Sequence, residues 1–236
     1  MSLNFTQTLS LIDRNCKSNS ISYTTADKTA DINLAMDEIM NLIFKSNGKW
    51  QYDDSNHTDY PIITTNLVAS QRDYTFVTDE AGNIILDIYK VMVKNEAGVF
   101  NEIYPVDQQS DENMTAFYDG RNLTGIPSRY DKTANGLFLD LIPSYSSTNG
   151  LKVFINREGS YFTSSDTTKK AGFSGLFHSY LALKPSIDYC KRNKVFDLSD
   201  RYERDLLKMQ SAVKKHYRDR GRDESPIITP ETVTSV

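Results

Sequence analysis

The sequence predicts an α+β protein: a helical bundle built from N- and C-terminal helices, with a mostly antiparallel β-rich lobe inserted between them. Two observations lead to this prediction. Apolar residues recur at helical spacing near both ends of the 236-residue chain, and short β-prone runs separated by turn residues occupy its middle. We expect helices within residues 1–50 and 173–222, the β-rich lobe at 51–172 and an extended tail at 223–236. Neither helical segment can bury its apolar face alone, so the two should pack on one another.

The first segment predicts two helices. The apolar residues of the first recur at spacings of 4, 3 and 4 over residues 4–17. The second has the clearest helical period in the chain, with Asp27 as its expected N-cap and Gly48 as the expected residue after its C-cap. The two apolar stripes consist of Phe5, Leu9, Ile12 and Cys16, and of Ile32, Ala35, Met36, Ile39, Leu42 and Ile43.

The middle of the chain predicts strands joined by turns. Two loops favour hairpins, 95–98 with the sequence Asn-Glu-Ala-Gly and 133–136 with Thr-Ala-Asn-Gly. Between them, residues 106–118 are polar with sparse apolar anchors, which predicts a short helix across one end of the sheet. The predicted strands are residues 62–67, 73–76, 84–94, 99–104, 128–132, 137–142 and 151–156.

The helical period returns at Ser174 and predicts two further helices. Pro185 removes a backbone donor from the first of them, so we expect a kink or a split there. The second, over residues 198–220, carries apolar residues on one face and charges on the others. Its apolar stripe consists of Tyr202, Leu206, Met209, Val213 and Tyr217. The tail at 223–236 has no helical period and is expected to be loose in the free protein.

Composition excludes several classes of protein. With 39% hydrophobic and 25% charged residues the chain resembles ordinary soluble globular proteins. No apolar run is long enough for a membrane span, and the first residues do not follow the pattern of a secretory leader, so we expect neither membrane insertion nor classical secretion. Cys16 and Cys190 cannot make a disulfide framework or a four-cysteine zinc site, and both are expected to be buried free thiols.

Residues that catalysis needs are sparse. His57, His178 and His216 form no metal-binding pair, and we expect His178 to be a packed or interfacial residue rather than a base. The acidic loop at 53–59 lacks the glycine and the closing glutamate of a calcium loop, so turn chemistry accounts for it better. The sequence therefore predicts no metal, no cofactor and no enzymatic activity.

Charge is distributed unevenly along the chain. Residues 173–222 carry 12 Lys or Arg against 6 Asp or Glu, which leaves 15 against 25 for the rest of the chain's 27 basic and 31 acidic residues. This asymmetry favours head-to-tail packing of copies or an oriented partner, although solvated helix faces account for it equally well. An electrostatic interface or a DNA channel is predicted at Lys208, Lys215, Arg218 and Arg222. Interspersed acidic residues and the lack of interleaved aromatic residues argue against sequence-specific DNA recognition.

The tail contains a second candidate site for a partner. Prolines at both ends of a short segment prevent helix continuation and favour extended backbone, while two isoleucines supply side chains that could fill pockets on a partner. The predicted partner-binding residues are Pro226, Ile227, Ile228, Thr229 and Pro230.

Three stretches of the sequence resemble virion proteins of tailed bacteriophages. They are residues 26–33 (ADKTADIN) with the following 48–56 (GKWQYDDSN), residues 157–163 (REGSYFT) and residues 218–226 (RDRGRDESP). Together they are similar to head-to-tail connector proteins, also called neck or tail adaptors. Pro185 departs from the continuous helix expected in that family.

The resemblance implies a function without enzymatic activity. A connector is a structural protein of the virion neck, made in the bacterial cytoplasm, that forms a homo-oligomeric ring, commonly of twelve copies. The ring stacks beneath the portal protein, and its C-terminal tail engages the portal. Further implied partners are a downstream tail or nozzle protein and, without sequence specificity, the genomic DNA that passes through the ring. No membrane is implied.

Two other classes of function stay open at this point. A tail-associated module could bind host glycan or other virion proteins through the β-rich lobe, but aromatic platforms for glycan are scarce because the chain has a single Trp. A hydrolase could use Asp53, Asp54 or Asp59 if two of these carboxylates had separated pKa values in a cleft.

Overall fold

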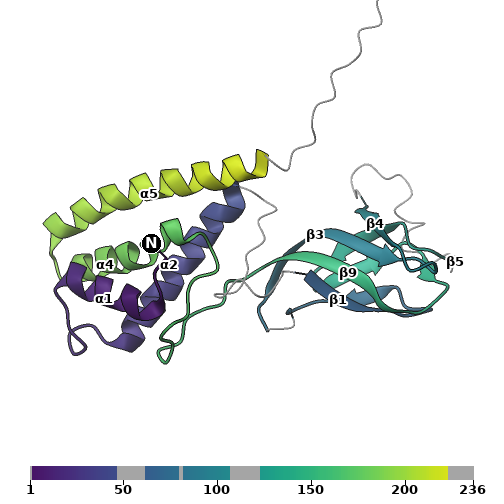
Figure 1. Cartoon of the computed structure of the whole chain (residues 1–236), viewed down its shortest axis with the longest axis horizontal. Coiled ribbons are helices and arrows are strands. Elements are labelled where there is room, and N and C mark those ends of the chain that lie inside the picture. The colour runs from purple at the N-terminus through teal and green to yellow at the C-terminus, as the bar shows by residue number, and fades with distance from the viewer. Residues whose placement is uncertain (1, 47–61, 80–81, 107–122, 223–236) are drawn as a thin grey trace, which may run out of the picture. The chain divides into compact units, whose positions relative to one another are not determined.

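The computed structural model describes residues 2–46, 62–79, 82–106 and 123–222. These residues form an α+β protein with a mostly antiparallel sheet, as predicted. The chain divides into two compact units, each described here by itself (Figure 1). The helical unit consists of Met1–Trp50, Tyr161–Lys170 and Ser174–Val236, and the β unit of Gln51–Ser160 and Ala171–Phe173. No helix in the described ranges has both the length and the apolar character of a membrane span.

The first two helices begin with side-chain caps. Helix α1, Phe5–Cys16, begins with a capping box in which the Asn4 side chain accepts from the Gln7 backbone and the Gln7 side chain accepts from the Asn4 backbone. Helix α2, Thr25–Ser46, begins two residues before the predicted N-cap. The hydroxyl of Thr24 accepts from the Asp27 backbone at 3.2 Å, so Thr24 occupies the capping position and Asp27 lies in the first turn.

The last two helices differ in part from the prediction. A short 3₁₀ turn, η1 at Gly175–Phe177, precedes helix α4, Tyr180–Arg192, so the helical segment is divided before Tyr180. Helix α4 continues through Pro185, and the expected split at this residue is wrong. Pro185 lacks the donor for a hydrogen bond to the Leu181 carbonyl and its ring crowds that carbonyl, but burial of the residues around it outweighs this cost. Helix α5, Phe196–Arg222, is the longest element.

The four α-helices of the described residues share a core with one extended segment. Helix α4 contacts α1, α2 and α5, and α2 also contacts α5. Residues 161–170, which we expected in the β-rich lobe, pack on the helices instead, because Asn33 exchanges hydrogen bonds of 2.9 and 3.0 Å with the Phe162 backbone. The Phe162 ring also stacks on Phe5 at 5.0 Å. Fully buried core residues include Phe5, Ile12, Ile32, Met36, Ile39, Ile43, Tyr180, Val213 and Tyr217.

The β unit contains a seven-stranded sheet in the order β1-β9-β3-β4-β6-β7-β2. All its pairs are antiparallel except β4 with β6. Its centre is the long pair of β3 and β9, on which Val91, Val93, Leu151, Val153 and Ile155 are buried at alternate positions. The strands are β1 Ile62–Leu67, β2 Asp73–Thr75, β3 Ile85–Lys94, β4 Phe100–Pro105, β6 Arg129–Thr133, β7 Gly136–Leu139 and β9 Ser147–Arg157.

The predicted run at 137–142 is divided between two sheets. Its first part is β7, and its end belongs to β8, Ile142–Pro143, which pairs in parallel with β5, Thr124–Gly125. Both predicted hairpins are confirmed, with loop 95–98 joining β3 to β4 and loop 133–136 joining β6 to β7. The short helix predicted at 106–118, apart from Val106, lies outside the described residues.

A buried ion pair fixes one end of the β unit. Arg157, the last residue of β9, pairs with Asp79, and the side chains of both are at most 6% exposed. Asp79 also accepts from the Asn83 backbone at 2.7 Å. Burial alone would raise the pKa of Asp79, but the hydrogen bonds from Asn83 and Arg157 outweigh it, so the pKa lies below 3.8.

Candidate functional site

Helix α5 presents a continuous basic stripe. Its members recur at spacings of 4, 3, 4 and 3, which places them on one face of the helix, and all are exposed. We define the basic stripe as Arg204, Lys208, Ser211, Lys215 and Arg218. The stripe contains three of the four residues predicted as an electrostatic site; Arg222 is the last residue of α5, but its side chain lies outside the described part.

Internal ion pairs neutralise the basic stripe only weakly. Lys208 lies 3.7 Å from Asp205 and Arg218 lies 3.5 Å from Asp219, both across exposed side chains. Exposed ion pairs of this kind contribute little to stability. The opposite face of α5 is held in the core by Leu206, Val213 and Tyr217, so the orientation of the stripe is fixed.

Helix α2 presents a stripe of the opposite sign. Exposed residues recur at spacings of 3, 4, 3 and 4, and we define the acidic stripe as Asp27, Ala30, Leu34, Asp37 and Asn41. Asp27 accepts from the Thr24 hydroxyl and Asp37 from the Tyr161 hydroxyl, and these neutral donors leave the negative charges in place.

Three further carboxylates adjoin the acidic stripe on the side of α4. Asp31 pairs with Arg192, and Glu38 pairs with Lys184 at 2.8 Å. Burial raises the pKa of Asp188, and the charges of Glu38 and Asp31 raise it further against the opposing effect of Lys184. The rise in the pKa of Asp188 thus comes first from its burial, and the neighbouring carboxylates of Glu38 and Asp31 add to it.

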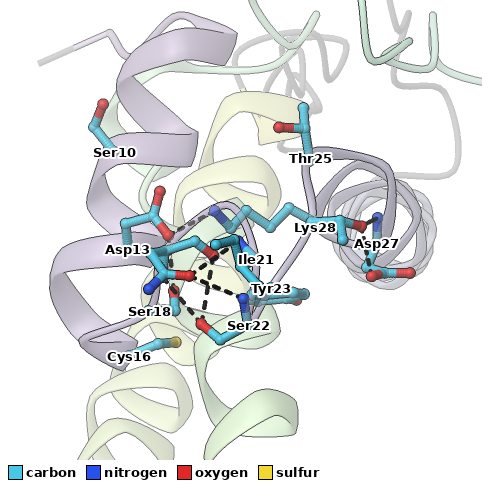
Figure 2. A network of polar contacts seen from close by, with 12 residues as sticks. Ser10, Asp13, Cys16, Ser18, Ile21, Ser22, Tyr23, Thr25, Asp27 and Lys28 are labelled. Carbon is cyan, nitrogen blue, oxygen red and sulfur yellow. Dashed lines mark hydrogen bonds and ion pairs between the residues drawn. The ribbon is translucent and has the colours of Figure 1, made fainter.

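A polar network fixes the turn between α1 and α2. Figure 2 shows the Lys28 side chain reaching from α2 to the Asp13 carboxylate on α1. Ser18 donates to the same carboxylate at 2.7 Å, and Asn19 accepts from the backbone of Ser22 at 2.9 Å. The turn that carries Tyr23 is therefore held on both sides.

Tyr23 lines a surface pocket of about 200 Å³. Its ring stacks on Tyr189 with centroids 4.5 Å apart, and its hydroxyl donates to Asp31. The cations of Lys28 and Arg192 lie 5.5 and 5.7 Å from the ring centroid. The lining residues are Ser22, Tyr23, Asp27, Tyr189, Arg192 and Asn193. One end of the acidic stripe thus borders a recess with an aromatic wall.

The groups in and near this pocket are poorly suited to nucleophilic or acid–base chemistry. Burial, followed by the hydrogen bond to Asp31 and its charge, raises the pKa of Tyr23 far above its usual value. Nearby, burial raises the pKa of the Cys16 thiol to about 12, so the thiolate is scarce near neutral pH. Both cysteines are free as predicted, Cys190 buried and Cys16 half-buried.

The other candidate catalytic or metal-binding residues are structural or lie outside the described residues. His178 is buried and its Nδ1 lies 2.9 Å from the Leu3 carbonyl, which confirms the expected packed role. No group of three or more metal-ligating side chains occurs within residues 2–46, 62–79, 82–106 and 123–222. His57, the loop at 53–59 with its three candidate carboxylates, and the tail residues 226–230 lie outside the described residues.

Sequence reasoning missed the acidic stripe and the pocket. The spacing of Asp27, Leu34 and Asp37 was a detectable signal for the stripe, because the apolar residues of α2 already fixed which face was outward. The pairing of Tyr23 with Tyr189 had no such signal, since it joins residues far apart in the sequence.

No protein-family model matches this sequence, and no curated protein matches it.

Proposed function

We propose that this protein is a structural connector of a tailed-bacteriophage particle, forming a ring of copies, with twelve the expected number, beneath the portal. The ring joins the capsid to a downstream tail or nozzle protein and surrounds the exiting DNA. The basic stripe of α5 is the observation that supports this proposal most. It is a charged surface about 21 Å long on a rigid helix, and such a surface suits recognition of an acidic macromolecule rather than a small substrate.

The resemblance of three sequence stretches to connector proteins is the reason for proposing a connector ring rather than another kind of assembly. The charge pattern is consistent with that assembly because heterologous contacts between unlike faces close into rings when the rotation permits. Neither consideration depends on a catalytic centre.

Ring formation is tested with the purified protein, alone and mixed with a portal ring. Light scattering should give a mass many times 26.8 kDa, and electron microscopy should show rings. Only monomers under both conditions would refute the proposal.

The electrostatic role of α5 is tested by charge reversal. Lys208→Glu combined with Lys215→Glu should reduce assembly or genome retention. The reduction should be larger at low salt, because the Debye length is only about 8 Å at 0.15 M and grows as salt is removed. Particle yield and stability equal to wild type at every salt concentration would make the stripe an ordinary solvated face.

The role of the tail is tested by truncation after Arg222. The shortened chain should keep its circular dichroism spectrum and melting behaviour but bind portal much more weakly, because the tail is proposed to dock there. Portal binding at the wild-type level would rule out a docking tail.

A further inference from the structure

Two stripes of the helical unit match in length and spacing and are opposite in charge. The acidic stripe on α2 and the basic stripe on α5 each span 15 residues, so about 21 Å of helix separates their first and last members. Both have exposed residues alternately three and four positions apart. Two helices with such stripes can lie along one another with their side chains interleaved.

The centres of the two stripes are complementary in shape. Leu34 is 62% exposed in the middle of the acidic stripe, with the small Ala30 one turn before it. Ser211 is the small residue in the middle of the basic stripe, between Lys208 and Lys215. A leucine opposite a serine can be covered by the stems of the flanking lysines, which removes its apolar surface from water.

The charged groups of the two stripes are available for a partner. Asp27 and Asp37 have hydroxyl donors, which do not neutralise a carboxylate. Among the described residues, the ion pairs of Lys208 and Arg218 are long and join acidic residues of their own helix. Unlike charges brought together in a helix contact would therefore replace weak local pairs rather than break strong ones.

We propose that the acidic stripe of α2 in one copy of this chain docks on the basic stripe of α5 in a second copy. This inference rests on the proposed ring and names the contact that builds it. The two stripes are different surfaces, so each docking event leaves one free stripe of each sign. Copies therefore add in the same direction until the ring closes. In this assembly the basic stripe is occupied by protein, not by DNA.

The test exchanges the two charges. Variant A carries Lys208→Glu and Lys215→Glu, and variant B carries Asp27→Lys and Asp37→Lys. The control carries Lys90→Glu and Lys132→Glu, which changes the net charge as variant A does but on strands of the β unit. Circular dichroism first establishes that each variant is folded. Assembly is then measured by light scattering and electron microscopy, with and without portal.

Variants A and B should each associate at least tenfold more weakly than wild type, and the control should associate normally. The protein carrying all four substitutions of A and B should recover assembly at least in part, because the new glutamates of the α5 stripe then meet the new lysines of the α2 stripe. Failure of this recovery while A and B are folded would overturn the proposed contact.

Two other outcomes distinguish the inference from the proposed function. If wild type and variant A form the same rings while A loses binding to double-stranded DNA, the basic stripe faces DNA and the inference is wrong, but the connector function stands. If wild type forms no rings alone or on portal, the connector function itself is wrong, and the inference with it.

Discussion

Lys28 has an almost fully buried side chain whose ammonium group reaches the Asp13 carboxylate. Asp13 is 35% exposed, so water can solvate it when its partner is removed. A substitution that keeps the volume of Lys28 should therefore cost much less than one that leaves a cavity.

We predict that Lys28→Ala lowers the free energy of unfolding by about 2–4 kcal/mol and that Lys28→Met lowers it by less than half as much. Urea denaturation followed by circular dichroism measures both. Lys45→Ala on the exposed surface of α2 is the control and should stay within about 0.5 kcal/mol of wild type. Equal losses for the two Lys28 variants would mean that the ion pair, not packing, dominates.

The buried pair of Asp79 and Arg157 predicts a dependence on pH. The pKa of Asp79 is lowered in the folded protein. Its contribution to the free energy of unfolding is therefore fully present above about pH 4 and is lost as the pH falls through the folded-state pKa. Asp79→Asn removes this contribution at every pH and leaves the buried Arg157 without its carboxylate partner.

Asp79→Asn should therefore cost about 3 kcal/mol at pH 7 and clearly less at pH 3. Chemical denaturation at a series of pH values gives the difference between variant and wild type. Asp87→Asn serves as the control because Asp87 pairs with Lys132 across half-exposed side chains, and its cost should stay below about 1 kcal/mol. A cost for Asp79→Asn that does not change with pH would contradict this assignment.

At the scale of elements, Gly136 is a turn residue that strand packing requires to be glycine. A Cβ atom at this position would lie 2.0 Å from the Tyr74 carbonyl oxygen, where β7 pairs with β2. Its backbone φ is not positive, so close approach rather than turn conformation requires the glycine here. Gly98, in the other hairpin loop, has φ +85°, and a Cβ atom there would make only an ordinary contact of 3.9 Å with the Lys94 side chain.

Gly136→Ala should displace β2 from β7 and cost more than about 2 kcal/mol, because the clash is with backbone that cannot rotate away. Gly98→Ala should cost about 1 kcal/mol, from conformation alone. Thermal melting measures both, and hydrogen exchange should show increased exposure of β2 amides only in Gly136→Ala. Comparable costs for the two variants would refute this distinction.

Local signals explain which elements could be predicted from the sequence. Helix α1 and the hairpin at 95–98 were predictable because their caps and turns depend on residues a few positions apart. The start of α2 was misplaced because Asp27 and Thr24 both suit capping, and the hydrogen bond from the Asp27 backbone decides between them. The effect of Pro185 was misjudged because burial by distant segments outweighs a local penalty.

Long-range contacts explain why only part of the site was predictable. The exposure of Lys208, Lys215 and Arg218 follows from the helical period of α5 alone. The acidic stripe borders α4 through Asp31 and Arg192, and such pairs between distant segments depend on tertiary packing.

At the scale of the whole molecule, the two units have separate apolar cores. Leu151 is fully buried in the core of the β unit, and Ile39 is fully buried among the helices. Large-to-small substitutions in a core lower the free energy of unfolding by about 2–5 kcal/mol. The unit that contains the cavity should be the first to open.

Leu151→Ala should therefore increase hydrogen exchange in β3 and β9 while amides of α2 and α4 keep their protection. Ile39→Ala is the matched variant and should have the reverse effect. Mass spectrometry of peptides after exchange separates the two units. Equal loss of protection in both units for either variant would show that they unfold as one.

The helical unit combines segments that leave the ribosome at very different times. Helices α1 and α2 are complete once Ser46 has been made, but their partners α4 and α5 begin only at Tyr180 and Phe196. At translation rates of about 5–20 residues per second, synthesis of residues 47–179 takes roughly 7–27 s. During this interval the apolar faces of α1 and α2 lack their partners α4 and α5. Every strand of the β unit is synthesised before α4. The order of synthesis thus favours folding of the β unit first and completion of the helical unit last.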